Sequence, residues 1–403
     1  MVDDERRNEV EDELRRQAKK SFDTGMTAFR RGDYSEALSA LDDALELCQD
    51  ISGSECGQAD CLHSSGIVLG EMGDLREALG CYEQALVLYR EVPGNECGQA
   101  NCLYNSGVAL GGLGDSRGAS ECYERALILF QGVPDSECVQ AECLFNRGAM
   151  LNELGDWWGA LGCFERSLTL FQGVPGSERE QADCLYGSGV SLSELGDCWG
   201  ALGYFDRALV LLDKGIVEVD WAEAERTGAR CLQGIGDCLV ELNEAVFPDH
   251  FARALEVFQR PEHVDHTKAD QASCLRSIGN GRSATDDLNG AVEAYQQAQD
   301  LYRQVGQPER ATEINVPLAR VLKRKAAAID SVFERLALLE ESLNLTVEAA
   351  LSLDRARFRL DRLDDRQRWF QAHARSTMDL ALEVAAELGR PHLISDLIAT
   401  WRT

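Results

Sequence analysis

Small and apolar residues recur along this chain at a fixed interval of 41 positions. In the second copy of the pattern, Leu62, Gly66 and Leu69 follow one another at steps of four and three residues, which places them on one face of a helix. Ala78 and Tyr82 belong to a second such face after a polar break. The pattern therefore predicts two antiparallel helices in each copy, which approach closely where the residues are small.

A Gly-Asp pair marks the break between the two helices. Glycine tolerates the left-handed backbone conformation that ends many helices, and the following aspartate can cap the next helix. An interval held this strictly indicates a unit copied in tandem, and a stack of such units presents an extended surface that favours binding over catalysis. The five pairs are Gly32-Asp33, Gly73-Asp74, Gly114-Asp115, Gly155-Asp156 and Gly196-Asp197.

The units are separated by turns that contain Pro and Gly, after which Asn95, Ser136 or Ser177 can cap the next first helix. The pattern becomes irregular after the fifth pair. A sixth copy has Asn243 at its turn, and a seventh has Asp286 in place of glycine. We expect a charged helical extension over residues 1–16, regular repeats over 17–214, degenerate repeats over 215–308 and a C-terminal helical region over 309–403.

The small residue of the first helix, the turn glycine and the Ala-aromatic-Ala face of the second helix stand at the offsets of the tetratricopeptide repeat. The chain resembles that family over residues 17 to about 214. Its unit is longer than usual and is similar to the long variant of kinesin light chains. The resemblance implies an all-α, right-handed superhelical solenoid of about seven to nine helix pairs that binds a protein or peptide in a concave groove.

In this family the first helices line the groove, so their repeated positions are the candidate binding residues. Packed helices lie roughly 8–10 Å apart, and three residues of an extended peptide span about 10 Å. A bound peptide would therefore meet one ring and one acid in about every three of its residues. Rings beside carboxylates predict Lys or Arg in the ligand. The alternatives are that the rings are core spacers and that the acids form a solvated face. The aromatic row is His63, Tyr104, Phe145 and Tyr186, the polar row is Asp60, Asn101, Glu142 and Asp183, and Asn105 and Asn146 complete the set.

The formal net charge of -29 and the pI near 4.6 disfavour nucleic acid and anionic membranes as partners, and they suit a basic protein or peptide. The sequence has no apolar run of membrane length and no apolar leader at its N-terminus. With these features, its fifteen cysteines predict free thiols in a reducing cytoplasm.

No residue pattern indicates catalysis or a cofactor, so we expect a protein that is not an enzyme. The repeated cysteines are expected to be small buried residues, since equivalent positions lie too far apart for disulfides. His263 and His266, with Asp249, His250 and Asp265, could offer metal ligands, but an exposed loop is the simpler interpretation.

Residues 365–371 and 380–391 are similar to the last helices before the peptidase domain of bacterial CHAT proteins, which are caspase-like. This resemblance implies an alternative function, in which the repeats are a sensor or regulatory module that controls a protease-type effector in cis or in trans.

Overall fold

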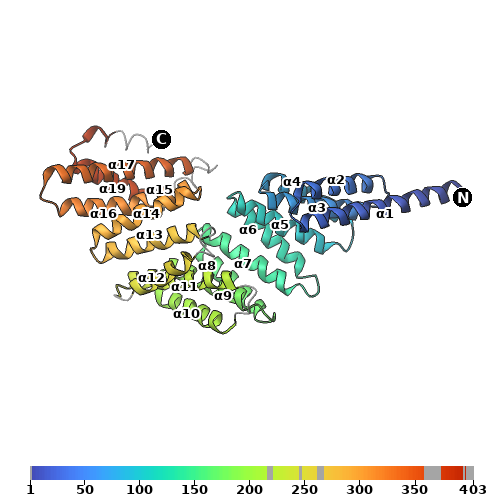
Figure 1. The fold of residues 1–403 in the computed structure, drawn as a ribbon, viewed down its shortest axis with the longest axis horizontal. Coiled ribbons are helices and arrows are strands. Elements are labelled where there is room, and N and C mark those ends of the chain that lie inside the picture. The colour runs from blue at the N-terminus through green and yellow to red at the C-terminus, as the bar shows by residue number, and fades with distance from the viewer. Residues whose placement is uncertain are drawn as a thin grey trace. The chain divides into compact units, whose positions relative to one another are not determined.

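The computed structural model describes residues 2–215, 221–244, 247–260, 267–357, 374–393 and 395. These residues form eighteen α-helices and no strand (Figure 1). Consecutive helices form antiparallel pairs, so the predicted all-α solenoid class is confirmed. The contacts divide the chain into two compact units, Met1–Asp197 and Cys198–Thr403.

Unit 1 is the regular part, in which each helix packs on the next one along the chain. First helices of successive pairs also touch, as α1 does with α3 and α3 with α5. The helices of unit 1 are α1 (Val2–Arg30), α2 (Tyr34–Gln49), α3 (Glu55–Met72), α4 (Leu75–Glu91), α5 (Glu96–Gly112), α6 (Ser116–Phe130), α7 (Glu137–Glu153), α8 (Trp157–Phe171) and α9 (Glu178–Glu194).

Unit 2 continues with helix pairs of less regular length. Helix α12 follows the Asn243 turn of the sixth copy, and its residues Phe251, Ala254 and Phe258 are buried. The described helices of unit 2 are α10 (Cys198–Gly215), α11 (Trp221–Glu241), α12 (Phe247–Phe258), α13 (Lys268–Ala284), α14 (Leu288–Gln304), α15 (Pro308–Glu313), α16 (Asn315–Ala327), α17 (Val332–Arg357) and α19 (Arg375–Glu387).

The turns within the pairs have the predicted left-handed backbone. The five turn glycines have φ values between 77° (Gly155) and 86° (Gly73). Asn243 and Asp286 take the same conformation, with φ of 57° and 67°, so the irregular copies keep the turn without glycine. The expected cap forms at Asp115, whose carboxylate accepts a hydrogen bond from the Gly118 amide at 3.0 Å, but the expectation is wrong for Asp74, whose side chain makes no cap hydrogen bond to α4.

In several pairs a ring of the second helix lies directly over a glycine of the first helix, whereas in the first pair Gly25 faces Leu41. A Cβ atom placed on Gly107 would lie 2.8 Å from Cε1 of Tyr123, closer than any side chain permits. Gly66, Gly148 and Gly279 face the rings of Tyr82, Phe164 and Tyr295 in the same way. Glycine is therefore required here by the close approach of the two helices.

The caps predicted at the turns between pairs do not form, since the side chains of Asn95, Ser136 and Ser177 make no cap hydrogen bond. Ser136 stands at the N-cap position of α7, as predicted, but its side chain does not cap that helix. Its hydroxyl instead donates to the Phe130 and Val133 carbonyls, both at 2.7 Å. Ser177 repeats this arrangement one unit later. The hydroxyl thus satisfies the open carbonyls at the end of the preceding helix.

Candidate functional site

The predicted site residues all lie in unit 1, on the first helices of four successive pairs. Helices α3, α5, α7 and α9 each contribute one residue to the aromatic row and one to the polar row. All four members of the aromatic row are half-buried. One turn later along α5, Val108 leaves 48% of its surface exposed.

Three members of the aromatic row, His63, Tyr104 and Phe145, pack against the second helix of their own pair. The Tyr104 and Tyr123 rings meet edge to face with centroids 5.8 Å apart, and Phe145 and Phe164 do so at 5.6 Å. The His63 ring lies 5.8 Å from the ring of Tyr82. These rings therefore contribute to the core on one side and leave part of their surface open on the other.

Two asparagines connect the aromatic row from one pair to the next. The Asn105 amide nitrogen lies 2.8 Å from Nε2 of His63, and the Asn146 amide donates to the Tyr104 hydroxyl at 3.2 Å. The residue in the same position after Phe145 is Gly187. The asparagines thus hold the polar edges of the rings in place.

The polar row contains two carboxylates without a basic partner among the residues that the structure describes. Asp60 accepts a hydrogen bond from the Tyr89 hydroxyl at 2.5 Å, and Glu142 accepts one from the Tyr104 hydroxyl at 3.4 Å. These hydroxyls are neutral, so both carboxylates keep their charge available to a ligand.

The other two members of the polar row are engaged differently. Asp183 pairs with Arg179 at 3.1 Å on its own helix, so its charge is largely compensated. The Asn101 amide lies 3.8 Å from the sulfur of Cys97. The polar row therefore varies in charge from one helix to the next.

Local burial and charge set the protonation of the groups along this face. Burial lowers the pKa of His63, and the nearby Asp60 carboxylate opposes the shift. Burial, helped by Glu142, raises the pKa of Tyr104 to about 12. At neutral pH both groups are therefore uncharged, and the carboxylates carry the charge of this face.

The prediction that the cysteines are small buried residues is wrong for one row. Cys56, Cys97 and Cys138 are exposed. Each lies in the first turn of its helix, four residues before the polar row. Burial, and next to it the carboxylates of Asp60 and Glu142, raise the pKa of Cys56 and Cys138, so these thiols are not activated.

The remaining repeated cysteines are mostly buried, as predicted. Cys61, Cys102, Cys143 and Cys184 are buried, and of the row in the second helices Cys163 is buried while Cys81 and Cys122 are half-buried. All fifteen cysteines are free thiols.

Across the described ranges, no three His, Cys, Asp or Glu residues converge in a way that could hold a metal ion. His263, Asp265 and His266 lie outside the described residues. In the same described part of the chain, every helix is too short or too polar to cross a membrane.

Residues 24–91, 62–131 and 140–214 match the tetratricopeptide repeat family. This part of the chain is therefore an array of tetratricopeptide repeats, as its residues predicted. No curated protein sequence matches the chain significantly. The similarity to CHAT proteins stays a prediction, and its first segment, residues 365–371, lies outside the described residues.

Several solved structures share the fold. The apo form of RapI is 16% identical, with a TM-score of 0.57 over 72% of this chain and 99% of its own. A Rap protein complexed with Competence and Sporulation Factor is 14% identical, with a TM-score of 0.53 over 92% of this chain and 99% of its own. Repeats of a Podosopora anserina putative kinesin light chain are 10% identical, with a TM-score of 0.42 over 50% of this chain and 97% of their own.

Proposed function

We propose that the tetratricopeptide repeats of this chain bind an extended, basic segment of a protein partner along α3, α5, α7 and α9. The chain then acts as a scaffold for protein–protein interaction and not as an enzyme. One observation carries the proposal: on α3 and again on α7, a carboxylate without a basic partner in the described part of the chain stands one turn before a half-buried ring, and the first helix between them carries the neutral Asn101. Asp60 precedes His63, and Glu142 precedes Phe145.

The chemistry of this face selects a cationic ligand. A Lys or Arg side chain can place its charge near a carboxylate while its stem or its cation covers the face of a ring. The net charge of -29 attracts a basic segment from a distance and speeds its association. The open surface of Val108 offers an apolar contact between the two charged positions.

The repeat distance also fits an extended peptide. Neighbouring first helices touch, as α3 and α5 do, so their candidate residues recur at a helix-packing distance of roughly 8–10 Å. A peptide in extended conformation covers this distance in about three residues. Because the two available carboxylates lie two first helices apart, on α3 and α7, we expect Lys or Arg residues about six positions apart in the bound segment.

The test uses random twelve-residue peptides displayed on phage and selected on the intact chain. The enriched peptides are then synthesised with a fluorophore, and their affinities are measured by fluorescence anisotropy. The test variant is Asp60→Asn with Glu142→Gln. We expect roughly five- to thirtyfold weaker binding, because each partly exposed charge pair contributes about 0.5–1 kcal/mol.

The matched control is Glu83→Gln with Glu121→Gln, which removes the same charge from exposed positions on the second helices α4 and α6. An equal loss of peptide affinity in the control and the test variant would show that only net charge matters, and it would contradict binding in the groove. Enrichment of peptides without Lys or Arg would contradict the basic ligand. No contact in the described part of the chain favours the alternative function, control of a protease-type effector.

A further inference from the structure

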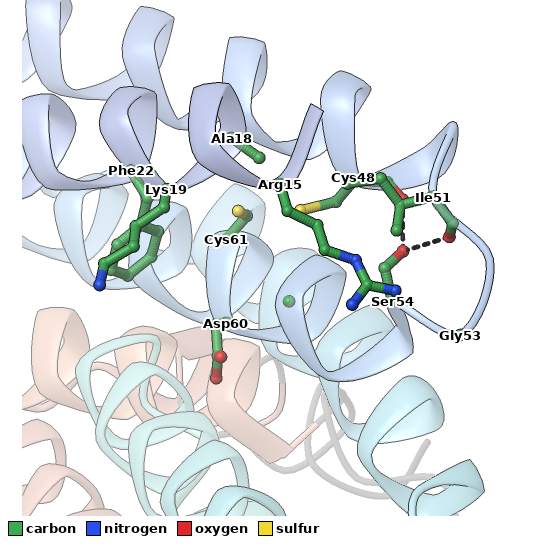
Figure 2. Close-up of a pocket in the computed structure, with 11 residues that line it drawn as sticks. Arg15, Ala18, Lys19, Phe22, Cys48, Ile51, Gly53, Ser54, Asp60 and Cys61 are labelled. Carbon is green, nitrogen blue, oxygen red and sulfur yellow. Dashed lines mark hydrogen bonds between the residues drawn. The ribbon is translucent and has the colours of Figure 1, made fainter. Parts of the chain in front are cut away.

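A cavity of about 320 Å³ opens at the N-terminal end of unit 1, between α1, the turn after α2 and the start of α3. Its walls are apolar, with Phe22, Cys48, Ile51 and Cys61 among them. Figure 2 shows the sulfur atoms of Cys48 and Cys61 directed into the space between these helices. A hollow of this kind can hold a ligand side chain.

The cavity exists because the first pair lacks a ring that the next three pairs have. Position 48 is cysteine, whereas the residues 41, 82 and 123 positions later are Tyr89, Phe130 and Phe171, all buried. A Cβ on Gly98 would lie 2.8 Å from the Tyr89 ring, while a Cβ on Gly57, its equivalent, would lie 3.3 Å from only the Cys48 sulfur. The empty space therefore corresponds to the volume of an aromatic side chain.

The charge at the cavity is also reversed relative to the later pairs. Arg15 and Lys19 extend from α1 at its edge (Figure 2), where the equivalent residues of the next pair are Cys56 and Asp60. No hydrogen bond or ion pair joins either cation to another residue of the described chain. Two cations one turn apart on the same helix attract a shared anionic group, so such a group is the favoured neighbour here.

In the second pair, a ring and a polar group occupy the position that is equivalent to the cavity. There the Tyr89 ring fills the space, and its hydroxyl donates to Asp60 at 2.5 Å. In the first pair the position equivalent to Asp60 is Lys19, so the polar group beside an incoming ring has to be an acceptor. Asp60 itself also lines the cavity and keeps its charge while it accepts the Tyr89 hydroxyl, so its one negative charge is outnumbered there by the two cations Arg15 and Lys19.

We propose that this cavity binds an aromatic side chain of a peptide ligand, with a carboxylate next to that residue held by Arg15 and Lys19. The carboxylate belongs either to the C-terminus of the peptide or to an adjacent Asp or Glu. The proposal rests on peptide binding by the repeats. It also sets the direction of the bound peptide, whose carboxylate lies at α1 and whose Lys or Arg residues lie toward α7.

The probes are three fluorescein-labelled pentapeptides that differ only around one Phe. The first is Gly-Ser-Gly-Ser-Phe with a free C-terminus, the second is its amide, and the third is Gly-Ser-Phe-Glu-Gly amide. Fluorescence anisotropy measures their affinity for the intact chain. We expect the first or the third probe to bind about tenfold or more tightly than the second, because a charged hydrogen bond is lost in the amide. The tighter of the two identifies the source of the carboxylate.

Two variants test the contribution of the cavity and that of the two cations separately. Cys48→Phe fills the space with the ring that the later pairs use and should abolish probe binding while retaining the fold, which circular dichroism and thermal unfolding check. Cys48→Leu is the second choice if Cys48→Phe does not fold. Arg15→Gln with Lys19→Gln should weaken binding about tenfold or more. The matched control is Arg16→Gln with Lys20→Gln, on the same helix but outside the cavity lining.

Three outcomes would overturn the inference: none of the probes binds the wild-type chain, a folded variant at Cys48 binds as tightly as the wild type, or the control loses as much affinity as the Arg15 and Lys19 variant. Glu142→Gln alone distinguishes this failure from failure of peptide binding in the groove, because Glu142 lies outside the cavity lining. This variant should weaken the binding of the long basic peptides and bind the short probes at wild-type strength.

Discussion

The side-chain amide of Asn105 on α5 lies 2.8 Å from Nε2 of His63 on α3, across the boundary between two repeats. Asn146 and Tyr104 repeat the contact one unit later. Phe145 offers no polar atom, and the residue in the asparagine position after it is Gly187. The asparagine is thus present where the preceding ring can form a hydrogen bond with it.

This pairing predicts that His63→Phe destabilises unit 1 beyond any change in ring packing. The half-buried Asn105 amide would lose its partner, which costs about 1 kcal/mol or more. Urea denaturation followed by circular dichroism measures the free energy of unfolding.

The companion variant is His63→Phe with Asn105→Ser, which copies the pair Phe22 and Ser64 at the equivalent positions. We expect this double variant to recover most of the lost stability, so that the double-mutant cycle gives a coupling of about 0.5 kcal/mol or more. Additive effects of the two substitutions would show that the contact carries no energy.

His63 also predicts a loss of stability in acid. Burial lowers its pKa in the folded chain, so the folded state binds the proton less readily than the unfolded chain does. Its contribution is present above the unfolded pKa of about 6.5 and is lost as the pH falls through the lowered value. Between pH 7.5 and 5.5, the wild type should lose more stability than the double variant at residues 63 and 105. Parallel losses would refute this role.

Asp237 in unit 2 predicts the opposite dependence on pH. Burial raises its pKa to about 6, and it accepts a hydrogen bond from Ser277 at 3.1 Å. The protonated carboxyl contributes stability at low pH that is lost as the pH rises through about 6. Asp237→Asn keeps an acceptor and should stabilise the chain at pH 8 by up to about 3 kcal/mol, with little effect at pH 4. The exposed Glu256→Gln is the control and should show no such difference.

Two glycines with open surroundings should respond to alanine in opposite directions. Gly114 has a φ of 81° at its turn, so Gly114→Ala should cost roughly 1 kcal/mol or more through backbone strain. Gly80 lies inside α4 without positive φ, and Gly80→Ala should stabilise the chain by about 1 kcal/mol. Thermal unfolding of both variants measures the difference, and a shift of the same sign in both would contradict the assigned conformations.

The helix pairs could be read from the sequence because their causes are local. A turn that needs left-handed backbone accepts Gly, Asn or Asp, so the turns at Gly73, Asn243 and Asp286 were predictable without knowledge of the packing. The approach of two helices requires a small residue opposite a ring, so the period of Gly107 and Tyr123 indicated their contact. The 41-residue interval therefore determined the repeat, its turns and the rows on the first helices.

Tertiary structure decided what each row does. Cys56 and Cys61 repeat at the same interval, yet one is exposed and the other buried, because five residues along a helix place them about 140° apart and packing covers only one of the two faces. The Asn105–His63 contact joins two repeats, and its geometry depends on how those repeats stack. The sequence shows that Cys48 replaces the ring of its equivalent, Tyr89. Only the packing of the helices shows that this replacement leaves a cavity with Arg15 at its edge. Local pattern thus determined the unit, and the contacts between units decided which of its surfaces remain open to a ligand.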